Sequence, residues 1–167
     1  MSSTARIRLL LVPLVALLAV AGVVGGAAAS PPTSASGTLT YTASTFNDVR
    51  SAGGNTIIGD LNATVSYTGT FSGTSTVQGT LILHPNGSAN FHDVETFTGT
   101  VNGVFGTVTF NLNGSSDPEG NVRATAVIVS ATGGLAGLHG VLKEIGTVPS
   151  PAGPEATYTG QIHRSNR

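Results

Sequence analysis

The sequence contains no cysteine and no tryptophan, and only 9% of its 167 residues are charged. Without cysteine, no disulfide can stabilise the fold, even outside the cell, and no lipoprotein anchor can form. The few basic residues form no cluster, which argues against nucleic acid or an anionic membrane surface as a partner. Stability must therefore come from packing and from a closed network of backbone hydrogen bonds.

The N-terminal segment has the three parts of a secretory signal peptide. Arg6 and Arg8 precede an apolar run at residues 9–24, and three alanines at residues 27–29 form a small-residue cleavage site. We expect residues 1–29 to be a cleaved signal peptide and the protein to be secreted from a bacterial cell, without stable membrane insertion. An uncleaved anchor is the alternative, but the apolar run is slightly short and lacks a charged stop.

The remaining chain has the size of one domain. Removing 29 residues leaves 138, with five basic and eight acidic residues and a formal charge of −3. Residues 30–36 contain only Ser, Pro, Thr and Ala, and they predict a linker. The folded domain is therefore expected to span residues 37–164.

A period of two runs through this domain. In residues 61–71, for example, Leu61, Ala63 and Val65 share one face, while threonine, serine and asparagine share the other. Such alternation is typical of half-buried strands and argues against disorder, although glycine and threonine each occur 23 times. No helical period occurs outside the leader. The expected strands are residues 37–46, 61–71, 75–84, 88–101, 104–112, 121–130, 135–145 and 156–163.

Two turns predict the register of the central strands. Residues 84–87 (His-Pro-Asn-Gly) favour a three-residue loop, which pairs Leu81 with Phe91 and places the apolar residues on one face. Residues 102–103 (Asn-Gly) predict a two-residue hairpin. The expected pairs across that hairpin are Phe97 with Val108, Glu95 with Phe110, Asp93 with Leu112 and Gly99 with Gly106.

The same pattern predicts an all-β fold, a single eight-stranded antiparallel up-and-down β-barrel. The hairpins are short, and an aromatic-Thr-Gly-Thr-x-x-Gly sequence recurs at residues 67–73 and 97–103, with glycines where strands bend. Closure removes exposed strand edges. A two-sheet sandwich is the alternative, but it needs longer crossing loops. Only residues 47–55 and 146–155 form long links.

Two carboxylates are predicted to face the interior of this barrel. Asp93 and Glu95 fall on the apolar face of their strand, where burial raises the pKa of a carboxyl group. They suit either a ligand-orienting role or, with a pKa near neutrality, acid–base chemistry. The alternative is a structural role, with the carboxyls bonded to tyrosines on the apolar side of other strands. Those tyrosines are Tyr41, Tyr67 and Tyr158.

Other kinds of site are not indicated. The four histidines show no metal-binding spacing, so we predict neither a metal nor a cofactor. No nucleophile motif or phosphate-binding loop is present, and the catalytic residues, if any, are unknown. His139 is kept as a candidate because it lies in a glycine-dense segment at residues 133–140. The candidate ligand-binding residues are Glu95, Asp93, Tyr41, Tyr67, Tyr158 and His139.

Three segments resemble a bacterial domain-of-unknown-function family with an allene-oxide-cyclase-like barrel. Residues 95–100 resemble its Glu-x-x-Thr-Gly strand, residues 132–140 resemble its Thr-Gly-Glu-Leu-x-Gly-Leu-x-Gly segment, and residues 158–160 are similar to its closing strand. The resemblance covers roughly residues 37–163 and implies an eight-stranded barrel with a central cavity. It implies no established activity, and the family's glutamate after Thr-Gly is Gly134 here.

Three functions follow as hypotheses. The first is a secreted barrel that binds a small apolar ligand in its lumen, oriented by Glu95 and the inward tyrosines. The second is a non-catalytic cell-surface or matrix component that uses its threonine-rich outer face. The third is an isomerase or cyclase of the allene-oxide-cyclase type with Glu95 as base or electrostatic stabiliser. The sequence does not specify an oligomeric state.

Overall fold

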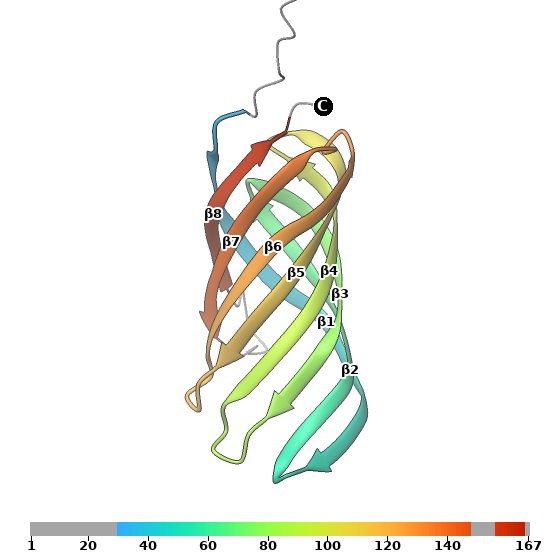
Figure 1. The fold of residues 1–167 in the computed structure, drawn as a ribbon, viewed down its shortest axis with the longest axis vertical. Coiled ribbons are helices and arrows are strands. Elements are labelled where there is room, and N and C mark those ends of the chain that lie inside the picture. The colour runs from blue at the N-terminus through green and yellow to red at the C-terminus, as the bar shows by residue number, and fades with distance from the viewer. Residues whose placement is uncertain (1–29, 148–155, 166–167) are drawn as a thin grey trace, which may run out of the picture.

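The computed structural model describes residues 30–147 and 156–165, which form eight strands (Figure 1). The predicted signal peptide, residues 1–29, lies outside the described residues. Within them, no helix is long and apolar enough to cross a membrane. The strands are β1 (Thr33–Ala52), β2 (Asn55–Gly69), β3 (Phe71–Leu83), β4 (Ala89–Val101), β5 (Val104–Ser116), β6 (Asn121–Gly133), β7 (Leu138–Thr147) and β8 (Ala156–Arg164).

The strands close into a single barrel. Each strand pairs antiparallel with the next, and β8 pairs with β1 from Thr33↔Ile162 to Leu39↔Ala156. The predicted up-and-down barrel is therefore confirmed, and the sandwich alternative is wrong. The barrel is elongated, and its β1–β2 hairpin extends beyond the other turns at one end (Figure 1).

The predicted register of the central strands is also confirmed. Leu81 pairs with Phe91 between β3 and β4, while Asp93 pairs with Leu112 and Glu95 with Phe110 between β4 and β5. The turn residue Asn102 has a φ of 51° and Gly103 a φ of 81°, as a type I′ hairpin requires. Asp93 and Glu95 consequently face the interior together.

Two predicted connections are strands instead. Residues 30–36 were expected to be a linker, but Thr33–Ser36 begin β1 and pair with β8, and Ala35 is buried. Residues 47–52 were expected to lie in a long link, yet they extend β1, which turns at Gly53-Gly54 into β2. Small and polar residues carry little strand preference of their own, so in both places the pairing with a neighbouring strand determines the conformation. The strand predicted at residues 135–145 begins later in the structure, because Leu135 belongs to the turn that precedes β7.

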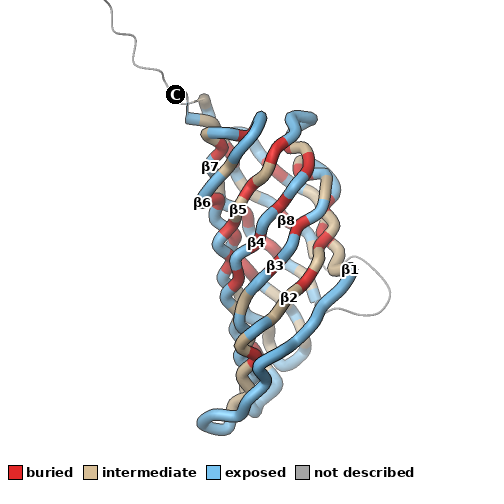
Figure 2. The backbone as a smooth tube through the Cα atoms, turned by 90° about the vertical axis from the view of Figure 1, so that its right-hand side faces the viewer, coloured by how far each residue is buried: buried red, intermediate tan, exposed pale blue. Residues whose placement is uncertain are grey.

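Aromatic side chains fill one end of the barrel. Phe71 is fully buried, and its ring centroid lies 5.4–6.3 Å from those of Phe97, Phe110, Tyr158 and Tyr67. Buried residues alternate with exposed ones along the strands that surround this cluster (Figure 2). This end contains the β2–β3, β4–β5 and β6–β7 turns, and we refer to it as the closed end.

At the closed end, the hydroxyl group of Tyr158 on β8 forms hydrogen bonds with backbone atoms of β2 and β3. The Phe71 backbone N–H donates to Tyr158 Oη at 2.9 Å, and Tyr158 Oη donates to the Thr68 carbonyl oxygen at 3.0 Å. The neighbouring Gly37 provides the space, since a Cβ there would lie 2.5 Å from the Tyr158 hydroxyl oxygen. The tyrosine therefore contributes hydrogen bonds as well as packing to the closed end.

Tyr158→Phe is expected to lower the free energy of unfolding by about 1–3 kcal/mol. The ring still fits, but a buried N–H and a partly buried carbonyl oxygen lose their partner. Urea unfolding of the two proteins at one pH measures the difference. A variant within about 0.5 kcal/mol of the wild type would show that the hydroxyl bonds add nothing to stability.

Candidate functional site

A cavity of about 200 Å³ opens at the other end of the barrel, where the β1–β2, β3–β4 and β5–β6 turns lie. We call this the open end. Apolar side chains dominate the cavity wall, and the partly exposed Phe46 and Leu83 stand near the mouth. The lining residues are Leu39, Tyr41, Ser44, Phe46, Leu61, Ala63, Leu81, Leu83, Ala89, Phe91, Asp93, Ser116, Val122, Glu144, Thr147 and Ala156.

Three carboxyl groups are buried inside the barrel. Asp93 and Glu95 come from β4 and Glu144 from β7, and their exposed fractions are 3%, 2% and 5%. All three occupy inward positions of their strands, as the period of two dictates. Asp93 and Glu144 line the cavity, whereas Glu95 lies nearer the aromatic residues of the closed end and does not line it. The cavity thus has an apolar mouth and two acidic groups in its wall.

Glu95 has hydrogen-bond donors of its own. The Ser75 hydroxyl donates to Glu95 Oε1, and the Tyr67 hydroxyl also bonds the carboxyl group. Burial raises the pKa of Glu95, and these two hydrogen bonds oppose that rise without cancelling it. Burial and the nearby Glu95 likewise raise the pKa of Tyr67. The buried carboxyl group of Glu95 therefore has hydrogen-bond partners inside the barrel.

Asp93 and Glu144 are not satisfied in this way. Asp93 Oδ1 and Glu144 Oε1 are buried and have no hydrogen-bond partner among the described residues. Burial, followed by the charge of Glu95, raises the pKa of Asp93 to about 7. Burial, followed by the charges of Glu95 and Asp93, raises the pKa of Glu144 to about 8. Both groups therefore titrate close to neutral pH.

No arginine or lysine of the described residues offsets this negative charge, and the exposed His92 opposes the rise in the pKa of Asp93 only in part. Arg50, Arg123 and Lys143 are exposed, and Arg164 pairs with Leu138 near the closed end. Gly79 makes room for the Asp93 carboxyl group, because a Cβ at Gly79 would lie 1.8 Å from Asp93 Oδ1. The backbone thus accommodates an acidic side chain at the point where a packed core would carry an apolar one.

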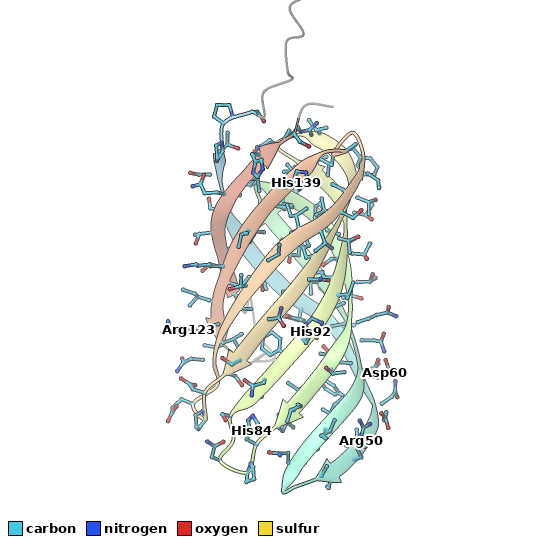
Figure 3. All side chains as sticks on the ribbon, in the orientation of Figure 1. Arg50, Asp60, His84, His92, Arg123 and His139 are labelled. Atoms are coloured by element: carbon cyan, nitrogen blue, oxygen red, sulfur yellow. The ribbon has the colours of Figure 1, made fainter. Side chains whose placement is uncertain are left out.

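The structure brings only some of the predicted site residues together. Asp93 and Tyr41 line the cavity, and Glu95 and Tyr67 lie behind it as a hydrogen-bonded pair. Tyr158 belongs to the closed end. The sixth candidate, His139, is exposed at the end of the barrel opposite His84 and Arg50 (Figure 3).

The surroundings of His139 explain this position. Its ring stacks on that of His163 at a centroid distance of 5.6 Å, and its Nε2 lies 3.3 Å from Ser165 Oγ. The glycine-dense segment that contains it forms the β6–β7 turn and the start of β7. His139 therefore takes no part in the cavity.

One residue of the site, Glu144, was not predicted from the sequence. Glu144 lies two positions after Leu142, which is buried, and one after Lys143, which is exposed. The alternation of buried and exposed positions in this strand therefore predicts that Glu144 faces inward. No group of three His, Asp or Glu side chains in the described part of the chain is placed to hold a metal ion.

These features define a class of protein: a closed eight-stranded antiparallel barrel with one aromatic end and an acidic, apolar-walled cavity at the other. The model of a family described as "Protein of unknown function (DUF3224)" matches residues 35–147, and the chain belongs to this family. No curated protein matches it.

A solved structure supports the fold. A DUF3224 protein of unknown function from Shewanella oneidensis MR-1 superimposes with a TM-score of 0.66, and the match covers 82% of this chain and 100% of that one. The two sequences are 17% identical, so this likeness concerns the fold alone.

Proposed function

We propose that this protein is an exported carrier or receptor that binds a small, largely apolar molecule in the cavity at the open end. The observation that carries the proposal is the cavity itself. Its apolar wall reaches solvent at Phe46 and Leu83 and also contains one buried oxygen each of Asp93 and Glu144 without a hydrogen-bond partner among the described residues. Binding sites for small molecules commonly combine an apolar wall with a few polar groups that orient the ligand.

Export is part of the proposal. It is supported by the signal-peptide features of residues 1–29 and by the absence of cysteine, which makes the fold independent of the redox state of its compartment. The expected partner is the small ligand, and neither nucleic acid nor a membrane is expected to bind. The excess of acidic over basic residues is consistent with this expectation.

The geometry favours binding over the cyclase alternative. That mechanism needs Glu95 at the end of an open pocket, with its carboxyl group accessible to the substrate. Glu95 does not line the cavity, and its carboxyl group is bonded to Ser75 and Tyr67. A group that is already hydrogen-bonded in the interior is poorly placed to accept a proton from a bound molecule.

Native mass spectrometry of the protein purified from its own host tests the proposal. We expect a chain that begins at Ser30 and carries a small molecule that dissociates on collisional activation. Ala63→Phe, which fills the cavity, should abolish the adduct. Val129→Phe places the same aromatic ring on the outer surface, where Val129 is 52% exposed, and should retain the adduct. An adduct that survives equally in both variants, or a folded protein without one, contradicts the proposal.

A further inference from the structure

The acidic side of the cavity has acceptors without donors. Asp93 and Glu144 stand on β4 and β7, which are not neighbours in the barrel, yet their charges interact across the lumen. An ionised carboxylate can only accept hydrogen bonds. Since Asp93 Oδ1 and Glu144 Oε1 have no partner among the described residues, a bound molecule that supplies donors would satisfy both.

The residues paired with the two acids on the neighbouring strands supply no such donor. Gly79 on β3 and Leu112 on β5 are paired with Asp93, while Ala124 on β6 and Tyr158 on β8 are paired with Glu144. The Tyr158 hydroxyl is bonded to backbone atoms of the closed end.

The other titratable groups around the acids are few. Tyr41, Tyr67 and Glu95 face the same interior, and Glu95 adds further negative charge. His92, next to Asp93 in the sequence, is exposed, and its Nδ1 lies 2.7 Å from Asn113 Oδ1. The charge inside the barrel is therefore negative whenever these acids ionise.

We infer that the ligand of this cavity is a small organic cation, an alkylammonium whose charged head lies between Asp93 and Glu144 and whose apolar tail points toward the open end. An ammonium group has several N–H donors and a positive charge, which matches two acceptors of negative charge. The aromatic rings of Tyr41 and Phe91 in the same wall suit a cation, and Leu61, Leu81 and Leu83 suit the tail. This inference rests on the proposed function and names its ligand class.

Binding of such a cation has a defined pH dependence. The ammonium group favours the ionised form of both acids, so binding releases the protons that Asp93 and Glu144 hold at neutral pH. With the pKa of Asp93 at about 7 and that of Glu144 at about 8, affinity should fall as the pH drops below these values. Above them it should stay high until the amine itself loses its proton.

Calorimetry with three probes of equal chain length tests the inference: n-hexylamine, n-hexanol and hexanoate. At about pH 9 the amine should bind at least about tenfold more tightly than the alcohol, and hexanoate should not bind. The advantage of the amine should shrink at least about tenfold at about pH 5, and titrations in buffers of different ionisation enthalpy should show proton release.

Matched variants locate the charge. Asp93→Asn and Glu144→Gln keep the shape of the site and should each lower the affinity for hexylamine about tenfold or more, with little effect on hexanol. Glu119→Gln, at an exposed turn position, should bind as the wild type does. Thermal unfolding of each variant confirms that it is folded.

The outcomes separate the ligand class from the proposed function. If the folded protein binds hexanol or hexanoate as tightly as hexylamine, the inference is overturned while the proposed apolar cavity stands. If none of the three binds and Ala63→Phe behaves as the wild type does, the proposed function fails as well. An amine preference that persists in the Asp93→Asn, Glu144→Gln double variant would also overturn the inference.

Discussion

Glu144→Gln is expected to be more stable than the wild-type protein above about pH 8, although it removes a charged group from a protein that has few charged residues. Glu144 Oε1 has no hydrogen-bond partner among the described residues, so the amide forfeits no hydrogen bond at that atom. The wild type must bury an ionised carboxyl group beside Glu95 and Asp93 at this pH, and the variant need not.

The stability of the wild type should depend on pH for the same reason. In the unfolded chain a glutamate ionises near pH 4, whereas folded Glu144 keeps its proton until about pH 8 and folded Asp93 until about pH 7. Between these limits the folded state holds more protons than the unfolded state, so stability falls as the pH rises. At 1.36 kcal/mol per pKa unit, Glu144 alone accounts for a loss on the order of 5 kcal/mol.

Urea unfolding at about pH 5 and about pH 9 measures this effect. The wild type should have the higher free energy of unfolding at the lower pH, and Glu144→Gln should reduce the difference. Glu119→Gln, at its exposed position, should show the wild-type dependence. A wild-type protein that gains stability from the lower to the higher pH would show that these carboxyl groups are ionised in the folded barrel.

The second large effect is expected at the closed end. Phe71→Ala should lower the free energy of unfolding by about 3–5 kcal/mol, because it leaves a cavity between rings that have no room to collapse. Phe71 is fully buried and contacts four other aromatic rings.

Phe105→Ala is the matched control, because Phe105 on β5 is a phenylalanine on the outer face of the barrel and is 66% exposed. It should change stability by less than about 0.5 kcal/mol. Urea or thermal unfolding at a constant pH compares the two variants. A Phe71→Ala variant that loses less than about 1 kcal/mol would mean that the closed end repacks around the missing ring.

Much of the barrel was predictable because hydrophobic period and turn chemistry act locally. The His-Pro-Asn-Gly and Asn-Gly turns determine register within their hairpins, and this register alone places Asp93 and Glu95 on the apolar face. The repeated aromatic-Thr-Gly-Thr-x-x-Gly sequence also has a local explanation. Its second copy brings Gly99 opposite both Gly73 and Gly106, where a Cβ at Gly99 would lie 2.3 Å from the Ser72 carbonyl oxygen.

Other features depend on partners that are distant in the chain. Thr33–Ser36 form a strand because β8 lies beside them, although their sequence resembles a linker. The register of β1 against β2 shifts between Tyr41 and Ala43, and that of β2 against β3 between Ile58 and Leu61. Such β-bulges leave little trace in the period of a single strand. The bounds of the strands were therefore harder to predict than their existence.

The candidate site divides in the same way. The sequence alone determined that its strands have an apolar inner face and that Asp93 and Glu95 lie on it, because successive side chains in a strand point to opposite sides. Only the closed barrel decided that Glu144 of β7 interacts with Asp93 of β4, that Glu95 is bonded to Ser75 and Tyr67, and that His139 lies at the other end. These relations depend on how eight strands close around one axis, and closure is a property of the whole ring rather than of any one strand.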